Sequence, residues 1–295
     1  MKSRIIVFLV VFCLLPIQGF ASKVTPSHVY QRTEFLRLVL EEHDLLDTQL
    51  YETIQSDEAL RHPRHVMQKV WKCHTIFSKI LKQKNIEVSP MPKLFSVREV
   101  RPSDVKNGVD HLIDEILKLG AVEIEEPVFV PARVPNDVYN NLKRICRAVR
   151  MEIIPSDVHQ VARAVNDNLD KIAQARGYDT DVSVKEFQGK IPADVYKKTL
   201  DLLTELRLLA LNPDFAIPGG VLIPAELSGK IEPQDVLTVM NESLAETNAI
   251  KYSLGIREHM TLPPYQEGKV PSDVFAQIER AHNIVLILLE KEDYK

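Results

Sequence analysis

The chain has 295 residues, of which 45% are hydrophobic and 26% are charged, and its formal net charge is −4. This balance is typical of one large or two ordinary globular domains, and it excludes a disordered chain or a multi-span membrane protein. Because the chain has no basic excess, we also expect no nucleic-acid partner. Composition by itself selects no activity.

The first 21 residues are typical of a secretory signal peptide. Lys2 and Arg4 give a positive start, an apolar run follows over residues 5–15, and a small-residue cleavage pattern ends at Ala21. The apolar run is shorter than the roughly 20 residues of a membrane span. We therefore expect a protein that is exported, either periplasmic or secreted, with no stable membrane span after cleavage. An uncleaved anchor is the alternative.

One short phrase recurs eight times along the chain: a proline, a variable residue that is often small or polar, an aspartate and then a valine. All eight copies have the valine three residues after the proline, and six have the aspartate, which His28 and His65 replace in the first two copies. Such an internal repeat indicates a repeat architecture. The repeat prolines are Pro26, Pro63, Pro102, Pro135, Pro155, Pro192, Pro233 and Pro271.

Each phrase is typical of a helix start, because proline is tolerated in the first turn and an aspartate there interacts favourably with the helix dipole. Apolar residues then recur at steps of three and four, which predicts amphipathic helices. The sequence thus predicts an all-α, eight-helix repeat protein. Five residues that follow a repeat proline are expected to be N-caps, namely Ser27, Ser103, Asn136, Ser156 and Ser272.

The spacing of the repeat prolines predicts two tandem four-helix units. Six of the seven steps are 33 to 41 residues long, but the step from Pro135 to Pro155 is only 20. We therefore expect a signal peptide over residues 1–21, a first unit over residues 22–152 and a second unit over residues 153–295.

Matching linkers also indicate a tandem duplication. A glycine and then a proline precede the fourth and the eighth repeat prolines at nearly equal distances. These residues are Gly120 and Pro127 in the first case, and Gly255 and Pro263 in the second.

The linkers are long, contain prolines and are predicted to be extended. A linker of about 16 residues can span about 50 Å, whereas a helix of about 18 residues is about 27 Å long. A linker can therefore return to the starting end of a helix, which would make successive helices of a unit parallel. Apolar linker residues 128–131 are expected to lie against the helices. Ile191, Ile231 and Val270, which precede repeat prolines, are expected to pack as hydrophobic staples.

The sequence contains no catalytic motif among those sought: no phosphate-binding glycine loop, no Gly-x-Ser-x-Gly and no His-Glu-x-x-His. We therefore expect no enzyme activity and no cofactor. The polar cluster at residues 41–44 is expected to be an exposed helix end rather than a general base. Four histidines are candidate metal ligands at one end of a bundle, with surface side chains as the alternative: His28, His62, His65 and His74.

Aromatic residues occupy one position of the repeat, four residues after the proline, in four copies. They are candidates for lining a ligand pocket at the helix starts, although a recurrent aromatic residue also suits a core position. The four residues are Tyr30, Tyr139, Tyr196 and Phe275.

Two cysteines, Cys73 and Cys146, remain after the predicted cleavage. They stand ten and eleven residues after repeat prolines, and so at nearly the same depth if the helix starts share one end. An exported compartment permits a disulfide between them. Two separate core thiols are the alternative.

Three classes of function remain open. An exported protein-interaction or scaffold module is favoured by a repeated helical architecture without catalytic residues. A periplasmic small-ligand-binding or sensory bundle, with a pocket between helices, is the second. A metal-binding protein or enzyme that uses the histidines is the third. The expected partner is accordingly an unknown protein or a small ligand.

Overall fold

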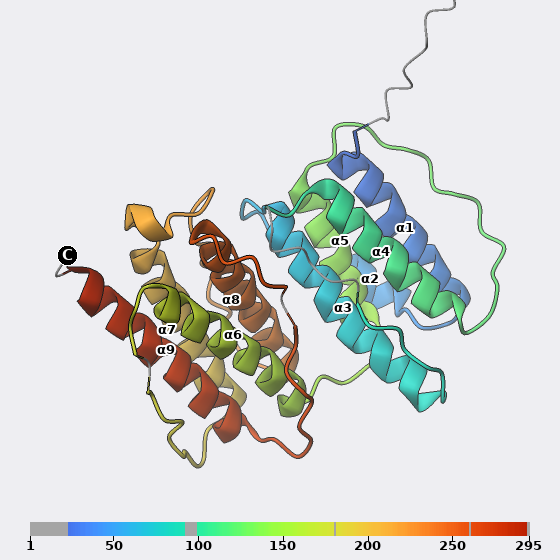
Figure 1. Ribbon diagram of the computed structural model, residues 1–295. Helices are drawn as coiled ribbons and strands as arrows, with labels where there is room; N and C mark the ends of the chain where they lie inside the picture. The colour runs from blue at the N-terminus through green and yellow to red at the C-terminus, as the bar shows by residue number, and fades with distance from the viewer. Residues whose placement is uncertain (1–22, 92–98, 180, 260, 294–295) are drawn as a thin grey trace, which may run out of the picture.

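The computed structural model describes residues 23–91, 99–179, 181–259 and 261–293, and over these ranges the protein is all-α, with no β-strand. The predicted signal peptide, residues 1–21, lies outside the described residues. In chain order (Figure 1), the helices are α1 (Pro26–Glu42), α2 (Thr48–Thr53), α3 (Pro63–Gln83), α4 (Pro102–Leu117), α5 (Pro135–Ala148), α6 (Pro155–Ala175), α7 (Pro192–Leu209), the 3-10 helix η1 (Pro213–Phe215), α8 (Pro233–Ser253) and α9 (Pro271–Asp293).

All eight long helices begin at a repeat proline, as the sequence predicts. Two residues further on, the aspartate or histidine of the repeat accepts a hydrogen bond from the backbone N–H of the residue before the proline. The distance is 2.8 Å for Asp104 in α4 and 3.0 Å for His65 in α3. This contact satisfies a backbone donor at the helix start, where no intrahelical acceptor is available.

The N-cap prediction is wrong, because the N-cap of each helix is the residue before the proline and not the residue after it. The five residues predicted to be N-caps are instead the second residues of their helices: Ser27, Ser103, Asn136, Ser156 and Ser272. Four of these five side chains hold the linker that leads into a neighbouring helix, by accepting the N–H two residues before its proline. The donor and acceptor pairs are Arg133 and Ser27 (3.0 Å), Arg61 and Asn136 (2.7 Å), Lys269 and Ser156 (3.1 Å), and Lys190 and Ser272 (3.1 Å).

The long helices pack in two groups of four. In the first bundle, α1 and α3 each lie beside both α4 and α5. In the second bundle, α6 and α7 each lie beside both α8 and α9. Figure 1 shows the two bundles side by side, with α3 of the first facing α8 of the second.

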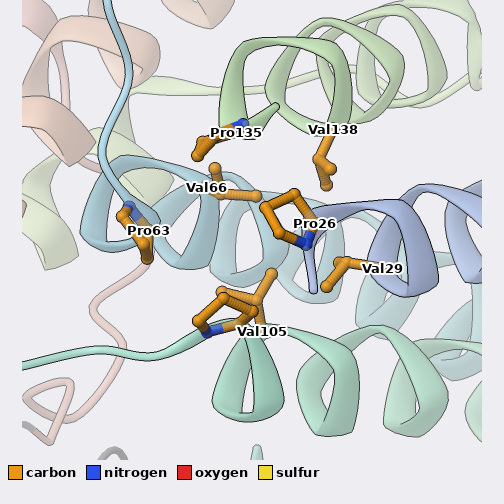
Figure 2. A pocket seen from close by; sticks show the side chains of 8 residues that line it. Pro26, Val29, Pro63, Val66, Val105, Pro135 and Val138 are labelled. Atoms are coloured by element: carbon orange, nitrogen blue, oxygen red, sulfur yellow. The ribbon is translucent and has the colours of Figure 1, made fainter. Parts of the chain in front are cut away.

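The four helices of each bundle run parallel to one another, since the N-terminal ends of all four lie together at one end of the bundle. Figure 2 shows Val29, Val66, Val105 and Val138 gathered among the four helix starts of the first bundle. Prolines and valines of the second bundle surround an equivalent hollow. The two hollows have volumes of about 20 and 10 Å³, which leaves room for a water molecule at most. They are therefore packing features of the bundle ends rather than ligand sites.

Three side chains that the sequence predicts to pack against the helices are exposed instead. Ile191 and Val270 are 57% and 53% exposed and are not staples, whereas Ile231 packs against the core. Ile191 and Val270 each directly precede the first residue of a helix, α7 and α9 respectively, and so lie outside the helical segment that packs on its neighbours. In the linker between α4 and α5, Val128 is 86% exposed, so this side chain does not lie against the helices either.

Candidate functional site

The two bundles meet where α3 packs on α8, and this contact contains buried charges. Arg61, just before α3, donates a hydrogen bond to Glu242 of α8 at 3.0 Å, and both side chains are almost completely buried. Arg61 also pairs with Asp57, and its guanidinium lies 4.1 Å from the ring centroid of Tyr139. Loss of either Arg61 or Glu242 would remove the ion pair that joins the bundles and leave the other charge buried with fewer partners, so the pair holds the bundles in one relative position.

A second buried carboxylate, Glu246, lies one turn further along α8. Arg64 donates to it at 3.0 Å and His65 Nε2 donates at 2.7 Å. His65 Nδ1 accepts the N–H of His62, so the proton of the neutral ring is assigned to Nε2. Burial raises the pKa of Glu246, but these donors outweigh burial and hold the pKa below its usual value. Glu246 is therefore ionised at neutral pH.

A cavity of about 360 Å³ lies beside these ion pairs, between the two bundles. Its walls come from α3 and α5 on one side and from α7 and α8 on the other, and residues 55–58 and 224–227 complete it. The volume is within the range of small-molecule sites. Five basic side chains line the cavity: Arg61, Lys69, Lys72, Lys143 and Arg147.

The arginines of the cavity are matched by acids, but the lysines are not. Arg147 pairs with Asp235 of α8, as Arg61 pairs with Glu242. Across the described ranges, no carboxylate forms an ion pair with any of the three lysines.

Lys143 donates instead to the carbonyl oxygen of Gln55 at 3.1 Å. Four acidic residues also line the cavity, namely Asp57, Glu58, Asp235 and Glu242, but none of them forms an ion pair with a cavity lysine.

Lys69 is the most unusual group in this wall. Its side chain is only 4% exposed, and its Nζ lies 4.6 Å from the ring centroid of Tyr139. In the part of the chain that the structure describes, no atom accepts a hydrogen bond from Lys69 Nζ. Burial lowers the pKa of Lys69 to about 7, with Glu242 opposing the shift and neighbouring cations adding to it. A large fraction of Lys69 is therefore a neutral amine at physiological pH.

Lys72 lies one turn after Lys69 on α3 and is equally buried. Its Nζ donates to Thr238 Oγ1 at 2.8 Å and to the carbonyl oxygen of Gln234 at 3.2 Å. Burial, and then the charge of Lys69, lowers its pKa well below the usual value. Two buried lysines without a carboxylate in contact are rare in a protein interior, and a bound anion would favour the charged form of both amines.

Two of the four predicted pocket aromatics are found at this cavity. Tyr139 and Tyr196 both line it. The Tyr139 hydroxyl donates to Glu242 at 2.7 Å, and the Tyr196 hydroxyl accepts the N–H of Leu227 at 3.2 Å. The repeat position therefore places two aromatic residues in the wall of the cavity.

The other two, Tyr30 and Phe275, lie away from the cavity. Each ring packs under a cation that stands two residues before the proline of the neighbouring helix. Arg133 lies 4.4 Å from the ring centroid of Tyr30, and Lys190 lies 4.3 Å from that of Phe275. These contacts hold a linker to a helix start.

The structure does not bring the four candidate metal-binding histidines together. His28 and His65 accept backbone N–H groups at the starts of α1 and α3, and His62 is the residue before α3. His74 stacks on His111, with ring centroids 5.5 Å apart. Within the described residues, no group of three or more His, Cys, Asp or Glu side chains is arranged to hold a metal ion.

Cys73 and Cys146 form a disulfide between α3 and α5, with Cα atoms 5.4 Å apart. Each cysteine is the chain neighbour of a residue that lines the cavity, because Lys72 precedes Cys73 and Arg147 follows Cys146. The bond is therefore close to the cavity in the chain. It thus joins the two helices that present the basic side chains.

The cavity lysines are not among the site residues that the sequence predicts. The available signal was a polar stripe on α3, in which His65, Lys69 and Lys72 recur at steps of four and three. On α8, Glu242 and Glu246 form a stripe of opposite charge. Two complementary stripes would have predicted that these helices meet.

No family model, curated protein or solved structure matches this chain. Among the described helices, none has both the length and the hydrophobicity that crossing a membrane requires.

Proposed function

We propose that this protein binds a small anionic organic molecule in the cavity between its bundles. The observation that carries the proposal is the pair of buried amines, Lys69 and Lys72, which line the cavity and have no carboxylate partner. A carboxylate or phosphate group would complement both amines through charge-assisted hydrogen bonds. Tyr139 and Tyr196 form part of the wall around the rest of the ligand.

An exported binding protein is compatible with the other features of the chain. The first 21 residues favour export, and a disulfide is typical of exported compartments. No catalytic motif, cofactor or metal is needed for binding alone. This supports the ligand-binding alternative rather than the scaffold that the repeats by themselves favour.

Native mass spectrometry of protein purified from its own host tests the proposal first. We expect a retained small molecule that is released on denaturation. Thermal unfolding with added inorganic phosphate then tests the anion site. A ligand at ten times its Kd stabilises the folded state by about 1.4 kcal/mol, which corresponds to a rise in Tm of a few degrees.

Two substitutions on α3 locate the site. Lys72→Met keeps the apolar stem but removes the amine, and we expect it to abolish the rise in Tm with phosphate. The control is Lys84→Met, which alters an exposed lysine at the end of α3 and should leave the rise unchanged. An equal rise in both variants would overturn the proposal.

A protein-interaction module is the alternative function, and exposed linker residues favour it. Val128 and Phe129, between α4 and α5, are 86% and 42% exposed. Exposed apolar side chains of this kind suit a protein contact. A retained protein in the native mass spectrum, without a retained small molecule, would support this alternative.

We also propose that the two bundles arose by duplication of one four-helix unit. Gln31 of α1 donates to the carbonyl of Pro127 at 2.7 Å, and Gln160 of α6 donates to the carbonyl of Pro263 at 2.7 Å. Each glutamine stands five residues after the repeat proline of its helix. We expect α1 to superpose on α6 and α3 on α7. A closer match after a shift of one or two helices would contradict the duplication.

A further inference from the structure

We propose that Lys69 is a nucleophile that forms an imine with a carbonyl group of the ligand, so that the cavity takes an aldehyde or a 2-oxo acid. This inference rests on the proposed function, because it assigns a chemical class to the anion bound in the same cavity. It also gives the two buried lysines different roles, with Lys69 as the nucleophile and Lys72 as a hydrogen-bond donor.

The hydrogen bonds of the two amines separate their roles. Lys72 Nζ is held by Thr238 and Gln234 of α8, which fixes it as a positioned donor. Lys69 Nζ lies over the face of Tyr139, and no described residue accepts a hydrogen bond from it. The Nζ of Lys69 can therefore attack a carbonyl carbon of the ligand without breaking a hydrogen bond to a described protein residue.

The surroundings of Lys69 favour the reactive form of the amine. Burial keeps the pKa of Lys69 at about 7, and a lysine is activated as a nucleophile when it is desolvated or stands near other cations. The charged groups that line the same cavity come from the segment before α3, from α3 itself, from α5 and from α8. Besides Lys69, they are Asp57, Glu58, Arg61, Lys72, Lys143, Arg147, Asp235 and Glu242.

The reaction needs no oxidant or second substrate. The nitrogen lone pair of neutral Lys69 attacks the carbonyl carbon, a C–N bond forms, and the carbonyl oxygen takes a proton to give a carbinolamine. Loss of this hydroxyl with the remaining N–H proton gives the imine and one molecule of water. Lys72 and Lys143, which line the same cavity, are N–H donors for the carboxylate of a 2-oxo acid.

Reductive trapping tests the imine on the full-length, disulfide-bonded protein. The protein is incubated with glyoxylate and sodium cyanoborohydride, and the modified lysine is identified by peptide mass spectrometry. We expect Lys69 to be modified at least about tenfold faster than exposed Lys84 at pH 7, because burial lowers the pKa of Lys69 to about 7 and so leaves much of this amine neutral. Equal rates at the two lysines would overturn the proposal.

The pH profile of wild-type labelling gives a second readout that needs no variant. The rate at Lys69 should rise up to about pH 7 and then level off, because burial holds the pKa of Lys69 at about 7. A rate at Lys69 that continues to rise well above pH 7 would contradict an activated amine.

Lys69→Arg separates the imine from anion binding. This variant keeps a positive charge but cannot form the imine, so we expect no adduct at position 69 and a Tm that still rises with phosphate. If wild-type protein gains Tm with phosphate but forms no adduct, the imine is wrong and the anion site stands. If neither phosphate nor glyoxylate has an effect on wild-type protein, the proposed function fails as well.

Discussion

Lys72 in the first bundle donates a hydrogen bond to the hydroxyl of Thr238 in the second bundle at 2.8 Å, and both residues line the cavity between the bundles. One buried amine thus serves the contact between the bundles and the proposed ligand site at once. A ligand that engages Lys72 will therefore be sensitive to how α3 is seated on α8. Variants that disturb this seating should weaken binding even where they do not touch the ligand.

The buried ion pair between Arg61 and Glu242 should be essential for stability. We expect Glu242→Gln to lower the free energy of unfolding by about 3 kcal/mol, because it leaves the buried Arg61 charge with only Asp57. Urea denaturation measures the change.

The control for this substitution is Glu258→Gln, which alters an exposed ion pair with Lys171. Exposed pairs contribute less than about 1 kcal/mol, so this variant should be nearly as stable as wild type. Similar losses in the two variants would show that burial of the Arg61 pair is unimportant.

The histidine at the start of α1 should be replaceable by the aspartate of the other copies. His28 Nδ1 accepts the N–H of Thr25, and an aspartate can make the same contact while adding negative charge at the positive end of the helix. We expect His28→Asp to raise the free energy of unfolding by about 0.3–1 kcal/mol.

The reverse change, Asp194→His at the start of α7, should lower the free energy of unfolding by a similar amount, because the acceptor of the Ile191 N–H would lose its negative charge. Thermal unfolding of both variants measures the effect. A loss of stability in His28→Asp would argue against the dipole interpretation of the repeat.

The stability of the ligand-free protein should rise with pH between pH 7 and pH 9. Lys69 has a pKa of about 7 in the folded state but about 10.4 when unfolded, so the unfolded state binds more protons in this window. The slope from one such group approaches about 1.4 kcal/mol per pH unit. Lys251, with a pKa of about 8, adds to the slope in the upper part of the window.

Lys69→Met isolates this contribution. The variant cannot take up the proton, so its free energy of unfolding should rise less steeply from pH 7 to pH 9 than that of wild type. Urea denaturation at three pH values provides the comparison. The same slope in both proteins would mean that Lys69 titrates normally.

The disulfide should contribute strongly to stability. Cys73 and Cys146 are 73 residues apart in the chain, and a closed loop of this length stabilises the folded state by about 4 kcal/mol in the chain-entropy model. We expect Cys73→Ser with Cys146→Ser to lower the free energy of unfolding by this order. Thiol counting on the denatured exported protein should find no free thiols, and two free thiols would contradict the bridge.

Local chemistry by itself determined where the helices begin. A proline fits the first turn, and the aspartate or histidine of each copy accepts the backbone N–H of the residue only three positions before it, as Asp104 does from Arg101. Such interactions are complete within one phrase of the chain, which is why all eight starts were predictable. The N-cap assignment failed at Ser27 because that side chain bonds to a linker more than 100 residues away.

Only the tertiary structure decided what the charged residues do. In a sequence, Lys69 and Lys72 are two more lysines on a polar helix stripe, and the default environment of such residues is solvent. They become buried because α8, more than 160 residues later, packs its own side chains across α3. The repeat aromatics divide for the same reason, since Tyr139 faces the second bundle whereas Tyr30 packs under Arg133. Burial, and the shift in amine pKa that follows from it, is a property of the contact between bundles and not of any local segment.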